Sequence, residues 1–323
     1  MAYSAAPEAV LRELVPDRAH LGDWGRVVAM KAAGMTDEGT LDHRGHKVWW
    51  GRVGESRSDG SAPLLTIHGG PGICHDCLEP LSALSGDRPV LFYDQYGCGR
   101  SDRAADPDDY DVELFVDEIA AVRQELALDQ VHLYAHSYGG PVLLEYMLRR
   151  QPVGVLSLTL SNTFPSTQAL ARGWDRRLDE LPRHHSDALR SGPTGDGDAF
   201  AAALQEFMTR FILPGAPPDP LIRSQQHSGA EVYQRMHGSS WFEPDGQWST
   251  WDATTRLAMI DVPTLVIGGT RDQCVPELAE ALAAGIPGAE HVVLDTAHLP
   301  FFESPDDYLQ VIQDFLARAD EKR

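Results

Sequence analysis

The residues best suited to chemistry are a serine, an aspartate and a histidine that each follow a short apolar run. Ser137 lies in residues 135–140, which read Ala-His-Ser-Tyr-Gly-Gly, directly after an expected strand and before an expected helix. A sharp strand-to-helix turn with small residues two positions before and after the serine exposes its hydroxyl, as in a nucleophile elbow. The first small residue is Ala135 where glycine is usual. The segment predicts a nucleophilic serine at position 137.

A serine hydroxyl is a weak nucleophile and needs a general base that is itself oriented by an acid. Where an elbow of this kind occurs, the chain order is serine, acid, histidine. Asp272 follows one apolar run, and His298 follows another further along the chain. Asp295 is the alternative acid, but it directly ends its own strand, so the loop position favours Asp272. The predicted catalytic residues are Ser137, Asp272 and His298.

An oxyanion hole is expected beside this serine. Residues 68–72 read His-Gly-Gly-Pro-Gly and follow an earlier apolar run. Glycine lets the backbone turn sharply and present an amide with no side chain in the way. Two fixed N–H groups can then stabilise the oxygen that gains charge during acyl transfer. We assign the N–H groups of Gly70 and Tyr138 to this role and expect His68 to brace the loop.

These residues need a fold that brings distant loops to one edge of a sheet. From about Gly39 onward, short apolar runs alternate with segments of helical spacing, which is typical of crossover units and a mostly parallel sheet. The expected strands are 47–53, 64–67, 90–93, 131–134, 155–160, 264–268 and 291–294. The expected helices are 112–128, 141–150 and a last helix that follows a Ser304 cap and begins with Pro305 and two acids. The predicted class is α/β, with the site at the carboxyl ends of the strands.

The alternation stops over residues 164–252. This stretch is rich in charged helical segments, Gly/Pro loops and aromatic residues, and it has no strand signal. We predict one α/β core formed by residues 1–163 and 253–323, interrupted by a helical cap over 164–252. Residues 1–38 are expected to form a polar, partly helical N-terminal extension.

The composition excludes several classes of protein. Of 323 residues, 42% are hydrophobic and 23% charged, which is ordinary for a packed globular chain. The formal net charge is 27 − 48 = −21, and such an acidic surface repels phosphate backbones and anionic lipid. We therefore expect no nucleic-acid partner and no membrane partner. No apolar run reaches the roughly 18 residues of a membrane span, and the first residues lack a signal-peptide pattern, so a cytoplasmic location is expected.

The cysteine pattern gives little support to a metal or disulfide framework. The chain has four cysteines, at positions 74, 77, 98 and 274, which is few for a disulfide-based fold of this length. Cys74 and Cys77 form one Cys-x-x-Cys pair, but no second ligand pair accompanies it and no histidine has metal-ligand spacing. We expect Cys98 to pack inside its loop. The prediction is that the protein uses no metal and no cofactor.

With these motifs, the chain resembles the proline iminopeptidase family of α/β hydrolases, serine peptidases that remove N-terminal residues, together with related amidases. The resemblance covers nearly everything after about residue 39. It is carried by residues 68–72, by 94–102 (Asp-Gln-x-Gly-x-Gly-x-Ser-Asp), by the cap segment 232–252 and by the tail 298–305. The resemblance implies an α/β-hydrolase fold with the Ser137, Asp272 and His298 triad beneath a helical cap.

The chain departs from this family where substrate specificity is set. Peptide-trimming members hold the substrate's α-ammonium with one glutamate in a Gly-Pro-Ser-Glu-Phe cap motif and another directly after the triad aspartate. Trp241 and Gln273 stand at these positions, and burying an ammonium without a carboxylate partner is costly. Glu243 or the face of Trp241 offers another anchor for a cation. Otherwise a pocket formed with Phe242 favours a neutral or acylated substrate.

The resulting prediction is a serine hydrolase that cleaves a small amino-acid-derived amide or an N-terminal peptide bond through an acyl-enzyme. Its partner would be a small molecule or short peptide, bound by Trp241, Phe242, Glu243 and Gln273, and the oligomeric state is left open. An esterase or lactonase acting on a small apolar substrate is the alternative, and a binding protein without turnover is a third reading. Dehalogenase or epoxide hydrolase chemistry needs a carboxylate at the elbow, which Ser137 excludes.

Overall fold

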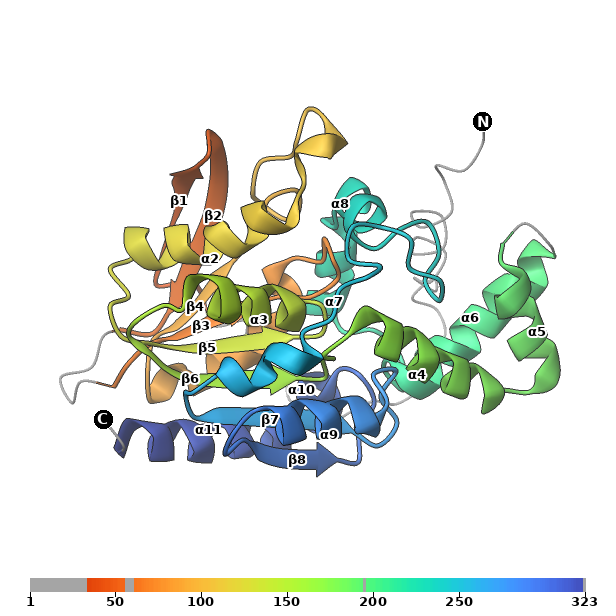
Figure 1. Ribbon diagram of the computed structural model, residues 1–323. Helices are drawn as coiled ribbons and strands as arrows, with labels where there is room; N and C mark the ends of the chain where they lie inside the picture. The colour runs from red at the N-terminus through yellow and green to blue at the C-terminus, as the bar shows by residue number, and fades with distance from the viewer. Residues whose placement is uncertain (1–33, 56–60, 194–195, 322–323) are drawn as a thin grey trace.

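An eight-stranded sheet lies at the centre of the computed structural model, which describes residues 34–55, 61–193 and 196–321 (Figure 1). The strand order is β1-β2-β4-β3-β5-β6-β7-β8. β1 pairs antiparallel with β2 and β2 antiparallel with β4, whereas β3 to β8 are parallel. The predicted α/β class with a mostly parallel sheet is confirmed.

Seven of the eight strands lie close to where the apolar runs predicted them, and β1 was not predicted. The strands are β1 (Asp37–His43), β2 (His46–Val53), β3 (Leu64–Ile67), β4 (Val90–Tyr93), β5 (Val131–His136), β6 (Val155–Ser161), β7 (Thr264–Gly269) and β8 (Glu290–Leu294). Every residue of β3, β4, β5 and β7 is buried, as expected for parallel strands covered on both faces. β1 already begins at Asp37, so the predicted extension to residue 38 ends too late, and residues 1–33 lie outside the described residues.

Helices cover both faces of the sheet. The α-helices are α2 (Val112–Glu125), α3 (Gly139–Arg150), α4 (Thr167–Asp179), α5 (Arg183–Ser191), α6 (Gly197–Phe211), α7 (Asp219–Gln226), α8 (Ala230–Met236), α9 (Pro276–Gly285), α10 (Pro300–Glu303) and α11 (Pro305–Glu321), and 3-10 helices span His75–Gly86, Pro107–Asp109 and Thr254–Met259. α2, α3 and α9 pack on one face, and α11 packs with His75–Gly86 on the other. No helix within the described ranges is long and apolar enough to cross a bilayer.

Two predicted helix ends differ from the structure, since α2 ends early and α3 begins at Gly139 rather than at residue 141. α11 begins at Pro305 after Ser304, as the capping pattern predicted. α2 is capped by Asp111, whose carboxylate accepts the N–H of Leu114 at 2.6 Å. It ends at Glu125, before the predicted end at residue 128.

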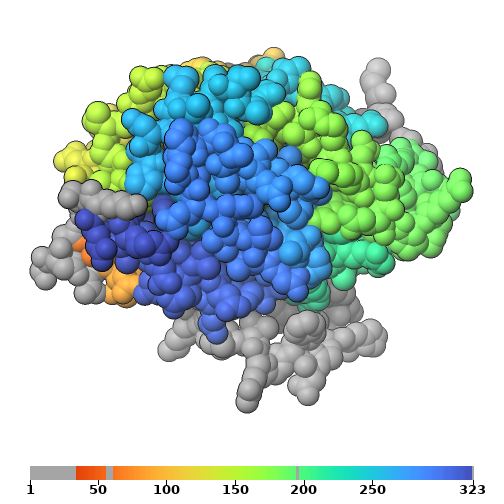
Figure 2. All heavy atoms as spheres, turned by 60° about the horizontal axis from the view of Figure 1, so that its bottom comes forward, coloured from red at the N-terminus to blue at the C-terminus, as the bar shows by residue number. Residues whose placement is uncertain are grey.

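Figure 2 shows the face on which the C-terminal part of the chain, in blue, lies beside residues of α4 and α5, in green.

The helices α4 to α8 are inserted between β6 and β7, and α4, α5 and α6 lie to one side of the sheet, past the arrowhead of β8 (Figure 1). The chain leaves and re-enters the core at adjacent points. Ser166 and Asp252 form an antiparallel bridge, the N–H of Thr167 donates to Trp251 O at 3.0 Å, and Ala253 N donates to Pro165 O at 2.9 Å. These contacts fit the predicted division at residues 164 and 252, which stays a prediction.

A buried carboxyl links α2 to the loop after β4. Glu118 is fully buried, and its Oε1 accepts the N–H of Tyr96 at 2.8 Å. Its Oε2 has no hydrogen-bond partner in the part of the chain that the structure describes. Burial raises the pKa of Glu118 to about 8, because the charged form is poorly solvated there. The native protein therefore holds this carboxyl protonated at neutral pH.

We expect the stability difference between Glu118→Gln and the wild type to depend on pH. The pKa of Glu118 lies above its ordinary value of 4.5, so between about pH 5 and pH 8 the folded state binds a proton that the unfolded chain releases. The wild type therefore loses stability as pH rises through this window, by about 1 kcal/mol per pH unit. The glutamine variant, which cannot ionise, does not. Urea unfolding of both proteins at the two ends of the window measures this, and a constant difference would contradict it.

Candidate active site

The structure brings Ser137, His298 and Asp272 into one hydrogen-bonded row. His298 Nε2 lies 2.9 Å from Ser137 Oγ, and His298 Nδ1 lies 2.6 Å from Asp272 Oδ1. An ionised carboxylate only accepts hydrogen bonds, so Nδ1 carries the imidazole proton and Nε2 can accept from the serine hydroxyl. All three residues follow parallel strands, β5, β7 and β8, at their carboxyl ends. This is the arrangement that a serine nucleophile and its base require.

The backbone at Ser137 is held in an unusual conformation. Its φ is +54°, a left-handed value that is uncommon for serine. Ser137 N donates to Ser161 O at 3.0 Å, and Thr163 Oγ1 donates to Ser137 O at 2.6 Å. A Cβ on Gly139 would lie 2.5 Å from Ile67 O, so glycine is what lets α3 begin against β3. Hydrogen bonds on both sides of the turn thus support the strained elbow.

The carboxylate of Asp272 is fully buried and surrounded by donors. Besides the imidazole, Cys274 N donates to Oδ1 at 2.8 Å and Asn162 Nδ2 donates to Oδ2 at 2.7 Å. The guanidinium of Arg177, on α4, donates through Nε to Asp272 O at 2.8 Å. Asn162 did not emerge from the sequence. The available signal was its position just after the expected strand 155–160, at the same sheet edge as the triad.

The alternative acid lies elsewhere. Asp295 Oδ1 accepts the hydroxyl of Thr270 at 2.6 Å, lies 3.5 Å from Arg271 Nε, and its side chain is 87% exposed. The structure therefore places Asp272, and not Asp295, against the imidazole of His298.

The glycine loop contacts the elbow directly. A Cβ added to Gly69 would lie 2.8 Å from Ser137 Cβ and 3.2 Å from Tyr138 N, so no larger residue fits there. Gly70 has a φ of +120°, a region that strongly favours glycine. The segments that carry Gly70 and Tyr138 therefore lie side by side, and their role as oxyanion donors stays a prediction.

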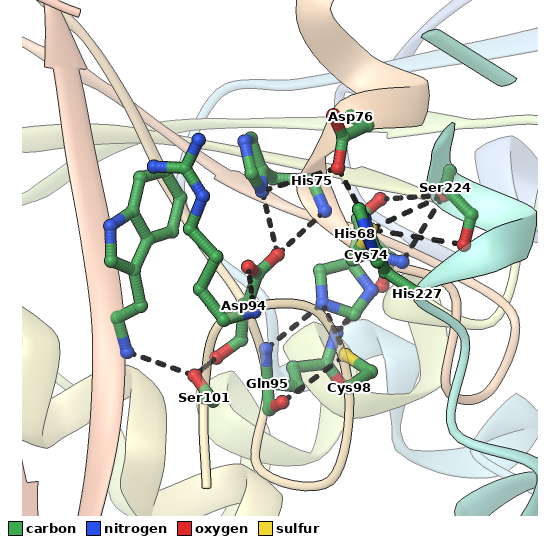
Figure 3. Close-up of polar contacts among 12 residues, drawn as sticks. His68, Cys74, His75, Asp76, Asp94, Gln95, Cys98, Ser101, Ser224 and His227 are labelled. Atoms are coloured by element: carbon green, nitrogen blue, oxygen red, sulfur yellow. Dashed lines mark hydrogen bonds and ion pairs between the residues drawn. The ribbon is translucent and has the colours of Figure 1, made fainter. Parts of the chain in front are cut away.

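His68 braces this loop as a neutral ring. Its Nδ1 bonds to Gly69 O at 3.1 Å, and its Nε2 accepts the N–H of Gln95 at 3.0 Å. Burial lowers the pKa of His68 to about 4, which keeps Nε2 free to accept. The side-chain amide of Gln95 donates through Nε2 to His68 O at 2.8 Å (Figure 3). The thiol of Cys98 packs inside the same loop and donates to Gln95 O at 3.2 Å.

A second buried carboxylate organises the loop after β4. Asp94 Oδ1 accepts both His75 N at 2.8 Å and His75 Nδ1 at 2.7 Å, and Oδ2 accepts Arg100 N at 2.8 Å (Figure 3). A Cβ on Gly99 would lie 2.1 Å from Asp94 Oδ2. Only glycine at that position therefore lets the backbone wrap around the carboxylate.

Potential metal ligands lie beside this carboxylate, but their chemistry does not suit a cation. Cys74, His75 and Asp76 each offer one atom within 4.8 Å of the others. Asp76 Oδ1 already accepts the guanidinium of Arg223 at 2.9 Å, and His75 Nδ1 is bonded to Asp94. Burial raises the pKa of the Cys74 thiol, whereas a metal binds the thiolate. The neighbouring guanidinium and the protonated thiol both disfavour an ion here.

The two positions where the family resemblance places glutamates are in contact. Gln273 Oε1 accepts the indole N–H of Trp241 at 3.1 Å and that of Trp174 at 3.2 Å. The ring of Phe242 lies 6.1 Å from Trp174, edge to face. Glu243 is exposed and makes no hydrogen bond or ion pair within the described ranges. Like Asn162, Trp174 was not predicted from the sequence, and no local sequence pattern indicates its contact with Gln273.

The cap rests on the glycine loop and on the elbow. Gly229, directly before α8, donates its N–H to Gly72 O at 2.8 Å, and a Cβ on Gly72 would lie 2.5 Å from Gly229 O. The hydroxyl of Tyr138 donates to Met236 O, in α8, at 3.4 Å. The cap therefore lies directly over the segments that carry the predicted oxyanion donors.

Comparisons with known proteins identify the family of the chain. The model of the alpha/beta hydrolase fold family matches residues 62–305. The proline iminopeptidase of Heyndrickxia coagulans is 36% identical over 288 residues, which cover 87% of this chain and 99% of that protein. The chain belongs to the proline iminopeptidase family of α/β hydrolases. It is therefore a hydrolase, as the sequence predicted.

Two further members of the proline iminopeptidase family support this assignment. The enzyme of Lactobacillus delbrueckii subsp. lactis is 34% identical over 281 residues, covering 83% of this chain and 94% of that protein. The crystal structure of the Mycobacterium smegmatis proline iminopeptidase matches with a TM-score of 0.83 at 28% identity, covering 88% of this chain and 99% of that one. The resemblance seen in the sequence is confirmed.

Substituting Gly69→Ala should lower the reactivity of Ser137 about 100-fold while the protein stays folded. The new Cβ would lie 2.8 Å from Ser137 Cβ, so the loop must move away from the elbow. A displacement near 1 Å at a reacting centre can cost about 100-fold in rate. We expect a loss of that order in hydrolysis of a p-nitrophenyl ester. Gly197→Ala is the matched control, because nothing lies within 4 Å of a Cβ there. Equal rates in both variants would contradict the close contact.

Proposed function

We propose that this chain is a serine hydrolase that cleaves a small amino-acid-derived amide or an N-terminal peptide bond through an acyl-enzyme. The observation that carries this proposal is the unbroken contact from Asp272 through His298 to Ser137, at 2.6 Å and 2.9 Å. The names of the relatives, proline iminopeptidases, support a peptide or amide bond as the target.

The catalytic residues are Ser137, His298 and Asp272. Ser137 Oγ attacks the substrate carbonyl while its proton passes to His298 Nε2, which later gives it to the departing nitrogen as the C–N bond breaks. A water molecule then attacks the acyl-enzyme, with His298 taking its proton and returning one to Ser137. Asp272 stays ionised and stabilises the imidazolium.

The N–H groups of Gly70 and Tyr138 bind the oxyanion in both half-reactions. Removing one such donor typically costs about 100- to 1,000-fold in rate. The contact of Gly69 with Ser137 supports this assignment, since it keeps the glycine loop against the elbow.

The substrate is a small molecule or short peptide with a neutral or acylated amino group. Support comes from Gln273, whose side chain replaces a carboxylate by a neutral amide with its oxygen turned to two indole N–H groups. Trp241 and Phe242 supply an apolar wall, and residues 164–252 act as the cap over it. Glu243, being exposed, is poorly placed to pair with a buried ammonium.

Ser137→Ala should remove all hydrolysis, and a fluorophosphonate should label Ser137 of the wild type. The label requires a serine activated by its neighbouring base, so a protein that only binds ligands would stay unlabelled. Mass spectrometry of the labelled peptide identifies the site. A labelled Ser137→Ala variant, or an unlabelled wild type, would refute the proposed nucleophile.

A matched panel tests the substrate class: free-amine aminoacyl anilides, their N-acetyl forms, and esters of the same acids. We expect the wild type to accept N-acetyl anilides at least as well as free amines, because Gln273 carries no charge. Gln273→Glu should raise the preference for free amines about tenfold, equivalent to ~1.4 kcal/mol.

Gln205→Glu, an exposed position on α6, is the control for added charge in this panel. A wild type that requires a free amine, and loses that requirement in Glu243→Gln, would show instead that Glu243 is the anchor. Faster turnover of every ester with no anilide cleaved would favour the esterase alternative.

A further inference from the structure

A row of buried polar side chains leads from the carboxylate of Asp272 into the protein interior. Tyr134 Oη lies 2.6 Å from Tyr308 Oη, which lies 2.7 Å from Ser161 Oγ. Ser161 Oγ lies 2.8 Å from Asn162 Oδ1, and Asn162 Nδ2 lies 2.7 Å from Asp272 Oδ2. Each of the five is at most 1% exposed. The row joins β5, α11 and the ends of β6 and β7.

The donor and the acceptor of each hydrogen bond in this row can be assigned, starting from the carboxylate of Asp272. The carboxylate of Asp272 only accepts, so the amide of Asn162 must turn its NH₂ toward it. Asn162 Oδ1 then faces Ser161, whose single hydroxyl proton must donate to it. Ser161 can only accept from Tyr308, and Tyr308 in turn accepts from Tyr134. The row is therefore a single directed chain of donors that ends on the triad acid.

The two tyrosines keep their protons. Burial raises the pKa of both Tyr134 and Tyr308 above its ordinary value, so neither ionises in the range where the protein functions.

The backbone of Asn162 is fixed as well, with φ at +50° and its N–H donating to Ile267 O at 2.8 Å. Asparagine tolerates this left-handed conformation better than most residues.

We propose that Tyr308 and Ser161, acting through Asn162, are positioning residues that hold the NH₂ face of the Asn162 amide on Asp272 and thereby orient His298. This inference rests on the proposed function, which makes Asp272 the acid of the triad. Nothing else in the described residues orients the Asn162 amide from its oxygen side.

Asn162 Nδ2 also donates to Ala297 O at 3.4 Å, so the amide keeps its orientation when the Ser161 hydroxyl is lost, but its buried Oδ1 is left without a donor. The amide then shifts toward another donor, and its bond to Asp272 Oδ2 lengthens, which is costly where water is excluded. The carboxylate moves or becomes less well satisfied by donors. A carboxylate with fewer donors attracts the positively charged imidazolium more strongly, so the protonated form of His298 is favoured. Since His298 must be neutral to accept the proton of Ser137, the acidic limb of the rate profile moves to higher pH.

The test is the pH dependence of fluorophosphonate labelling at Ser137, which needs no knowledge of the substrate. We expect Ser161→Ala and Tyr308→Phe to move the acidic limb upward by about 0.5–1 pH unit and to lower the plateau rate about tenfold. Tyr134→Phe, one hydrogen bond further away, should show a smaller shift in the same direction.

Matched controls separate this role from simple loss of a buried hydroxyl. Ser157→Ala removes a fully buried hydroxyl from the same strand, where it bonds His132 Nδ1 at 2.7 Å outside the row. Tyr146→Phe removes a buried hydroxyl that accepts from Arg123 at 2.8 Å. Both should lower the melting temperature and leave the pH profile in place. The proposal is overturned if Ser161→Ala and Tyr308→Phe shift the profile no more than these controls.

A second readout keeps the two proposals apart. The Nδ1–H proton of His298, bonded to Asp272 at 2.6 Å, should give a far-downfield NMR resonance that weakens or moves in Tyr308→Phe. If wild-type Ser137 is never labelled, the proposed function fails, and this resonance still decides the role of the row. An unchanged resonance in Tyr308→Phe, which retains the packed ring, would overturn the positioning role even if Ser161→Ala fails to fold.

Discussion

The carboxylate of Asp272 is a charge buried completely inside the protein, and the rest of the site is arranged to make that tolerable. A buried charge is stable only when hydrogen-bond donors surround it. Its donors come from Asn162 after β6, Cys274 after Asp272 itself, and His298 after β8. Three adjacent parallel strands must therefore end at one edge. The adjacent strands β6, β7 and β8 bring these chain positions, far apart in sequence, into contact.

At the same edge of the sheet, the glycine loop of residues 68–72 packs very closely against the turn at Ser137. Gly69 lies against Ser137, and Gly139 lies against Ile67 O, so neither position has room for a side chain. The two glycines on that side contribute no side-chain packing to the glycine loop. The loop is instead held from behind, by the neutral ring of His68 and the amide of Gln95. Steric access and rigidity are thus supplied by different residues.

The sequence was most informative where function and burial coincide. Continuous apolar runs placed β3 to β8, and Ser137, Asp272 and His298 each follow such a run. β1 was not predicted, because its sequence DEGTLDH buries just Leu41 and His43 at an antiparallel edge. Asn162 carries no acid or base that a catalytic motif would indicate, because its contribution is an amide donor. The bond from Trp174 to Gln273 joins α4 to the loop after β7 and depends on how the cap packs, which no local pattern records.

That packing ties specificity to catalysis. Helix α4 holds two consecutive residues of the acid loop, Arg177 bonding the carbonyl of Asp272 and Trp174 bonding the side chain of Gln273. A shift of the cap helix is therefore transmitted to the carboxylate that orients the imidazole. Glutamine has the shape of glutamate and keeps the indole bonds that a carboxylate would also accept. Under the proposed function, a neutral side chain at position 273 changes which substrates bind, while these contacts keep the carboxylate of Asp272 where it is.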